Sequence, residues 1–238
     1  MRAHEVSFLD LVQGEKQFQV PLYQRTYSWS DKQLTQLWRD LLEQAEGMAA
    51  AAGRPGHFIG SIVLAPSPSM AAGGVQRWLV VDGQQRLTTL MLVLAAIRDH
   101  VRVEDEAAAD RIHRQFLVNE FRHGEEHLRL LPTQADRESY RALILGSPGG
   151  SAAGAVTEAY RFFRTSLVAA DDPDDVGRIE EVVKSGLSIV EISADRGDNV
   201  YRIFESLNNT GLQLSQADLL RNCNCSGRAS RLTVTGSG

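Results

Sequence analysis

The residue types best suited to chemistry stand together in residues 80–90, VVDGQQRLTTL. A short apolar strand leads into residues 82–86, DGQQR, called the elbow below, and a predicted helix begins there. The N-terminus of a helix leaves backbone N–H groups unpaired and carries partial positive charge, so it binds anions. Arg86 in the first helical turn is unfavourable for the helix itself, and a bound phosphate or a carboxylate partner would explain it. The elbow therefore predicts a phosphate site.

A structural interpretation of the elbow stays open. Asp82 and Gln85 have the spacing of a capping box, in which side chains satisfy the free N–H groups of the helix and Arg86 is simply exposed. Under either interpretation Gly83 permits a backbone turn that a side chain would obstruct.

A second segment with binding chemistry covers residues 20–29, VPLYQRTYSW. Its aromatic side chains Tyr23, Tyr27 and Trp29 are interleaved with glutamine and arginine, which suits stacking on a base or gripping a phosphate. The alternative is that these aromatics pack under the following helix. The Gln-Arg pair here and the one in the elbow favour binding if the fold brings them together.

The elements that must position these segments follow from caps and periodicity. Ser7-x-x-Asp10 and Ser30-x-x-Gln33 predict two helix starts. Strands are expected at 18–20, 58–64 and 78–81, the last apolar enough to be covered on both faces, and a helix is expected after the elbow. Helices are then predicted at 111–121, 134–145, 155–169, 176–184, 199–207 and 215–221, a strand at 187–192, and loops at 49–56, 65–74, 146–154 and 171–175.

Composition and missing motifs exclude several classes of protein. The 238 residues are 43% hydrophobic and 23% charged, enough for a real core, and no apolar run reaches the roughly 18 residues of a membrane span. The N-terminus has no signal-peptide core, so a cytoplasmic protein with no membrane contact is expected. Cys223 and Cys225 are the two cysteines, which excludes a disulfide scaffold and a four-cysteine zinc site. The sequence has no P-loop, no dinucleotide fingerprint, no histidines at metal-ligand spacing and no strongly basic block.

Four blocks of the chain, in order, resemble the N-terminal domain of GmrSD-type restriction proteins, which is described as ParB/sulfiredoxin-like. The blocks are FQVPLYQRTYSW, HFIGSIVL, VVDGQQRLTTL and VYRIFESLNNTGLQLSQADLLRN, within residues 8–222. The elbow is the most specific of them. Family members include GmrSD enzymes against modified phage DNA and SspE-like proteins that sense DNA phosphorothioation.

The resemblance implies an α+β fold. A ParB/sulfiredoxin-like small mixed sheet with helices is expected in residues 1–100, the nucleotide-binding region. A mainly helical region, 101–222, completes the same domain. The last sixteen residues, 223–238, are polar and small, so a disordered or non-native tail is expected there.

The resemblance also implies a function in anti-phage restriction, in which hydrolysis of an NTP (GTP or ATP, with Mg²⁺) is coupled to a nuclease. Expected partners are DNA, modified by phosphorothioation or on its bases, and a C-terminal HNH-type nuclease domain that is absent from this chain. The predicted catalytic residues are Asp82, Gln84, Gln85 and Arg86. The predicted nucleotide-binding residues are Tyr23, Gln24, Arg25, Gly83 and Thr88. The predicted DNA-binding residues are Arg25, Tyr27 and Trp29, and no metal-ligand cluster is predicted.

Chemistry suggests how these residues would act. Asp82 is expected to hold a divalent metal or orient water, and Gln84 or Gln85 to position the attacking water. Arg86 with Arg25 would stabilise charge on the γ-phosphate.

Two other functions stay open. The same pocket could read a DNA phosphate or phosphorothioate without hydrolysis. Residues 101–222 carry fourteen basic and twenty-one acidic residues, which would also suit a toxin- or antitoxin-like protein-interaction domain.

Overall fold

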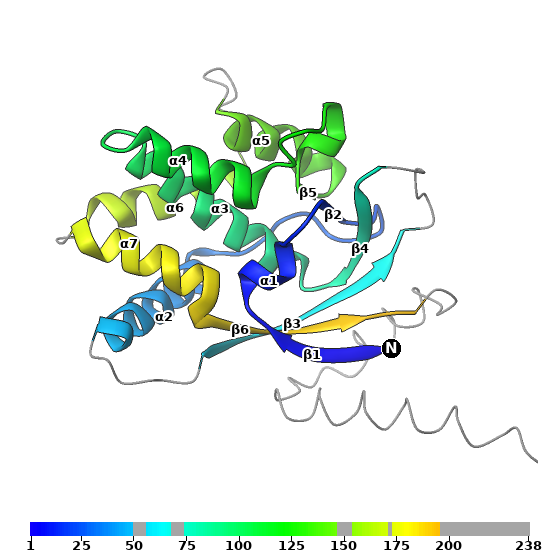
Figure 1. Ribbon diagram of the computed structural model, residues 1–238, viewed down its shortest axis with the longest axis horizontal. Coiled ribbons are helices and arrows are strands. Elements are labelled where there is room, and N and C mark those ends of the chain that lie inside the picture. Colours follow the sequence, from blue (N-terminus) through cyan, green and yellow to red (C-terminus); the bar gives the residue numbers. More distant parts are fainter. Residues whose placement is uncertain (50–55, 68–73, 147–153, 171–172, 196–238) are drawn as a thin grey trace, which may run out of the picture.

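The computed structural model describes residues 1–49, 56–67, 74–146, 154–170 and 173–195, and within them the chain forms an α+β fold, as expected (Figure 1). The strands are β1 (Arg2–Val6), β2 (Lys16–Gln19), β3 (His57–Pro66), β4 (Gln76–Asp82), β5 (Leu130–Leu131) and β6 (Leu187–Ser193). The helices are α1 (Phe8–Val12), α2 (Asp31–Ala49), α3 (Gln84–Val101), α4 (Glu106–Ile112), α5 (Gln134–Leu145), α6 (Ala155–Val168) and α7 (Pro173–Glu181).

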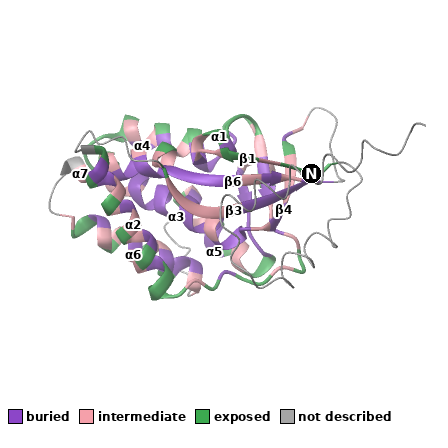
Figure 2. Cartoon of the chain, turned by 90° about the horizontal axis from the view of Figure 1, so that it is seen from below, coloured by how far each residue is buried: buried purple, intermediate pink, exposed green. Residues whose placement is uncertain are grey.

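The six strands form one mixed sheet in the order β1-β6-β3-β4-β2-β5, to which both halves of the chain contribute. β6 runs parallel to β3, and β4 runs antiparallel to β3 and parallel to β2. Val80 and Val81 of β4 are fully buried in two different apolar clusters, which confirms a strand covered on both faces. Figure 2 shows β6 buried over most of its length and β3 buried in its second half only.

The predicted helix at 111–121 is wrong at both ends. α4 begins at Glu106 because the Asp105 side chain accepts a 2.9 Å hydrogen bond from the backbone N–H of Ala108 and so caps the helix earlier. The helix continues as a π-helical turn, His113–Leu117, and Val118 is then extended and pairs with Leu128.

Sequence patterns also missed β1 and β5. β1 is a polar edge strand, held in place by antiparallel pairing with β6, and β5 has two residues. Neither carries a usable alternation of apolar and polar residues. The other predicted elements within the described residues are present, with ends shifted by up to a few residues. The helices expected at 199–207 and 215–221, the tail 223–238 and most of the predicted loop residues lie outside the described part of the chain.

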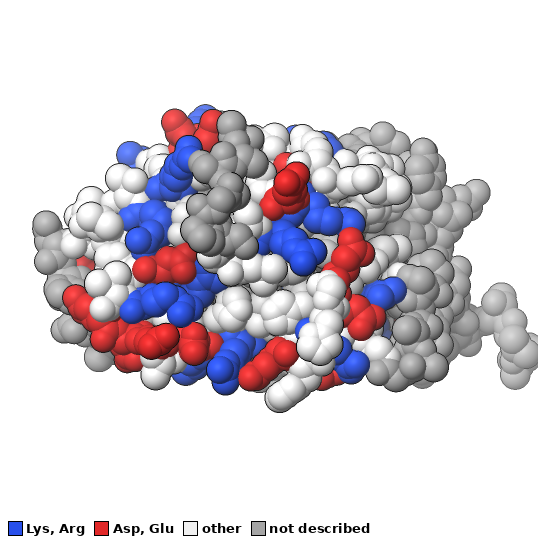
Figure 3. All heavy atoms as spheres, turned by 90° about the horizontal axis from the view of Figure 1, so that it is seen from above, with Lys and Arg blue, Asp and Glu red and all other residues white. Residues whose placement is uncertain are grey.

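Acidic and basic side chains are interleaved on the helical face seen in Figure 3. Ion pairs join Arg114 to Glu120 at 3.2 Å and Arg137 to Glu125 at 2.9 Å. This face therefore presents no single-sign basic surface. In the part of the chain that the structure describes, no helix is long and apolar enough to cross a membrane.

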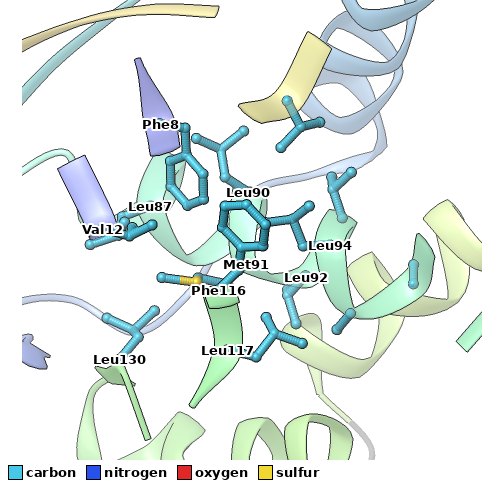
Figure 4. Close-up of a cluster of buried hydrophobic side chains, with 14 of the residues drawn as sticks. Phe8, Val12, Leu87, Leu90, Met91, Leu92, Leu94, Phe116, Leu117 and Leu130 are labelled. Atoms are coloured by element: carbon cyan, nitrogen blue, oxygen red, sulfur yellow. The ribbon is translucent and has the colours of Figure 1, made fainter. Parts of the chain in front are cut away.

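The core is built around α3 (Figure 4). This helix packs against α4 and α6, and it contacts α7. A helix that is apolar on most sides is stable only when it is surrounded, and almost all of residues 84–98 are buried. The side chains around it include Phe8, Val12, Phe116, Leu117 and Leu130. Such packing fixes the helix, and with it the elbow at its N-terminus.

Candidate functional site

The elbow turns at Gly83, the residue that caps α3. Gly83 has a φ of 85°, in the left-handed region, and makes no side-chain cap. Asp82 belongs to β4 and the Gln85 side chain bonds elsewhere, so the capping-box interpretation is wrong. The first N–H groups of α3 are consequently left without side-chain caps, which suits an anion.

Gly83 also lies against strand β3. A Cβ built on Gly83 would be 2.7 Å from the Ser61 carbonyl oxygen. We expect Gly83→Ala to lower the free energy of unfolding, measured by denaturant titration, by about 2–3 kcal/mol, because strain at positive φ and a backbone clash add together. Gly14→Ala is the matched control, since Gly14 has a φ of 81° with open space around it. Equal losses in the two variants would show that the approach to Ser61 is unimportant.

The 21–30 loop is held against the elbow by glutamine side chains. Gln24 donates from Nε2 to the Val81 carbonyl at 2.7 Å, and Gln84 donates from Nε2 to the Arg25 carbonyl at 3.0 Å. The two Gln-Arg pairs, far apart in sequence, are therefore brought together by the fold.

Gln85 fixes the next part of the same loop with both ends of its amide. Its Nε2 donates to the Thr26 carbonyl at 3.1 Å, and its Oε1 accepts from the Ser28 N–H at 2.8 Å. Gln85 is buried, and both ends of its amide take part in this contact. Its position in the structure is that of a residue that shapes the loop.

The loop and the elbow enclose a pocket of about 790 Å³, called the elbow pocket below. It is lined by residues from the loop, from α2 and from the elbow: Tyr23, Gln24, Arg25, Trp29, Gln33, Asp82, Gly83, Gln84, Gln85 and Arg86. Most of the predicted site residues are thus side by side.

The charged groups of the elbow pocket differ in how firmly they are held. Arg86 donates to the Ser61 carbonyl, and its guanidinium lies against Gly60 so closely that a Cβ on Gly60 would be 2.8 Å from Cζ. Within the described residues, the side chains of Arg25 and Asp82 make no hydrogen bond or ion pair. One fixed cation, one free cation and one free carboxylate therefore line the pocket.

Two predicted site residues lie outside this lining. Tyr27 is 5% exposed, and its hydroxyl is 2.7 Å from the Thr89 hydroxyl. Burial raises the pKa of Tyr27, so the phenol stays protonated. Thr88, predicted to bind nucleotide, is 3% exposed within α3. Both side chains are therefore packed inside the protein, whereas Trp29 lines the pocket.

Three residues were not singled out from the sequence as site residues. Gln33 was assigned to a capping box, which the 2.9 Å hydrogen bond from the Ser30 N–H confirms, and it also lines the pocket. Gly60 and Ser61 support Arg86 from within β3. A glycine inside an apolar strand often marks a bulge or a close approach, so Gly60 was the available signal, and the β3–β6 register does shift there.

The fold and the pocket define an α+β domain with a polar cleft at an open helix N-terminus. Residues 8–224 match the family described as GmrSD restriction endonuclease, N-terminal domain. Because the match covers most of the chain, the chain belongs to this family. Its role is therefore in a restriction system, and DNA is the partner of such enzymes. The search of curated proteins found no match.

Proposed function

We propose that the elbow pocket binds a nucleoside triphosphate and hydrolyses it, and that modified DNA controls this turnover. One observation carries the proposal. Arg25 and Asp82 face the pocket with uncommitted charges, next to the fixed guanidinium of Arg86 and the uncapped start of α3. Cations and free N–H groups around a space of about 790 Å³ suit a polyphosphate.

The hydrogen bonds of the lining residues suggest a different role for each of them. Phosphate oxygens would accept from the first N–H groups of α3, and Arg86 and Arg25 would stabilise charge that develops during transfer. Gln84 uses Nε2 for the loop, which leaves its Oε1 to orient the attacking water. Gln85 holds the loop in place.

Magnesium fits this arrangement. Mg²⁺ is commonly held by one or two carboxylates together with substrate phosphates, and Asp82 is an uncommitted carboxylate in the pocket. No cluster of three or more metal-ligating residues occurs in the described ranges, so the phosphates would complete the site. When bound, Mg²⁺ would offset phosphate charge.

Phosphate release tests the proposal. The protein is assayed with each of the four NTPs and Mg²⁺, alone and with plain, phosphorothioated or base-modified duplex DNA. We expect turnover that modified DNA changes and that Asp82→Asn, which keeps shape but removes charge, largely abolishes. Release no faster than that of Asp82→Asn with every NTP would rule out hydrolysis at this site. Equal responses to plain and modified DNA would rule out sensing.

A second candidate is a DNA-reading module without hydrolysis. Leu22 is 80% exposed and Tyr23 is 49% exposed, three and two residues before the free Arg25. Sulfur is less well hydrated than oxygen, so an apolar surface beside a cation would favour phosphorothioate over phosphate. This function predicts selective binding of modified DNA without NTP, together with no phosphate release.

A further inference from the structure

A second pocket of about 380 Å³ adjoins the elbow pocket. The two share three lining residues, Trp29, Gln33 and Arg86. Trp29 and Arg86 therefore stand at the border between two spaces, of which the first is rich in charged and amide groups.

The second pocket has a different chemistry because apolar side chains from three elements meet there. Leu37 comes from α2, Ile59 from β3 and Leu90 from α3, and all three belong to or pack against the main core cluster. Leu37 and Leu90 are buried in the core, so packing holds their part of this wall in place. Together with the Trp29 ring it offers a surface for a flat, weakly hydrated group.

One end of the second pocket is polar and organised by Asp40. Its Oδ1 accepts a 2.8 Å hydrogen bond from Gln36, and its Oδ2 lies 3.3 Å from Nε2 of His57. Both carboxylate oxygens are thus engaged, and the carboxylate orients the imidazole. The other ring nitrogen, Nδ1 of His57, has no protein partner among the described residues.

We propose that the second pocket binds the base of the nucleotide whose phosphates occupy the elbow pocket, and that His57 contacts the edge of that base. This inference rests on the proposed function. A nucleotide joins a polyanion to a flat heterocycle with a hydrogen-bonding edge. The elbow pocket suits the polyanion and the second pocket suits the heterocycle, and the two pockets meet at Trp29 and Arg86. His57, held by Asp40, is a specificity-determining residue.

The test compares ligands with and without a base. Dissociation constants are measured for the four NTPs and for inorganic tripolyphosphate, each with Mg²⁺. His57→Ala removes the edge contact, and Gln36→Trp fills the pocket from an exposed position on α2. We expect both variants to bind the preferred NTP about tenfold more weakly, with a flattened order of preference among bases and unchanged affinity for tripolyphosphate. Gln44→Ala, on α2 outside both pockets, is the matched control.

The outcomes separate this inference from the proposed function. Wild-type protein that binds neither NTPs nor tripolyphosphate contradicts both. Wild-type protein that binds tripolyphosphate as tightly as NTPs contradicts the base site alone. Variants that keep both the melting temperature and the NTP affinities of the wild type also contradict the base site. Variants whose affinity falls equally for NTPs and for tripolyphosphate contradict it as well.

Discussion

Replacing Arg86 by alanine is expected to lower NTP turnover at least about a thousandfold, the scale of losing an arginine that stabilises phosphoryl-transfer charge. The reason is positional. The Ser61 carbonyl and the backbone at Gly60 hold the Arg86 guanidinium at the edge of the elbow pocket before any ligand arrives. A preorganised cation does not have to be reoriented during the reaction. Removing it should therefore lower mainly the rate of the chemical step.

The measurement is single-turnover and steady-state phosphate release. Arg86→Lys keeps the charge but loses the planar fork that reaches both Ser61 and a phosphate, so only partial recovery is expected. Arg39→Ala is the control, because Arg39 is exposed on α2 and lines neither pocket. A folded Arg86→Ala protein with unchanged turnover would remove Arg86 from the mechanism.

Replacing Arg98 by alanine is expected to give the largest loss of stability, about 3–5 kcal/mol in the free energy of unfolding. Arg98 is 2% exposed inside the helical layer. It forms a two-point ion pair with Asp99, with contacts of 2.7 and 2.8 Å, and it donates to the carbonyls of Leu143 and Ile144 in α5. Truncation would leave a partly buried carboxylate and two carbonyls without their donor.

The neighbours of Arg98 include a histidine that the surroundings keep neutral. Burial, with the Arg98 charge adding to it, lowers the pKa of His113 to about 4. His113 is therefore neutral at pH 7, and its Nδ1, 3.0 Å from Arg98, can accept a hydrogen bond. Tyr160 donates a 2.6 Å hydrogen bond to Asp99 and completes the cluster.

Equilibrium unfolding in urea measures the effect. Arg98→Met fills the volume without the charge, yet it still takes the arginine partner away from Asp99, so we expect a loss smaller than that of alanine but clearly above zero. Arg102→Ala is the control, since its 3.4 Å pair with Asp110 is exposed and should contribute no more than about 1 kcal/mol. If Arg98→Ala and Arg102→Ala unfold alike, the buried cluster does not anchor α3 to α5.

The local structure of the candidate site could be predicted from the sequence because its signals are local. The apolar strand at 78–81, the glycine turn and the helix that follows are set by residues a few positions apart, and the structure has all three. The caps at Ser7 and Ser30 were readable for the same reason. The family's four blocks likewise needed only the order of residues.

The tertiary structure decided what each polar side chain is free to do. The sequence alone assigns the same catalytic role to Gln84 and Gln85. In the structure, both ends of the Gln85 amide bond to the loop, whereas Gln84 bonds to it through Nε2 only. For Tyr27 the sequence left DNA contact and packing inside the protein both open, and in the structure Tyr27 is buried. Such outcomes depend on β4, α3 and the 21–30 loop meeting across more than fifty residues of chain. Hydrogen-bond partners at that separation are set by the order of the strands and by core packing. Neither produces a periodic pattern of residues that could be recognised in the sequence.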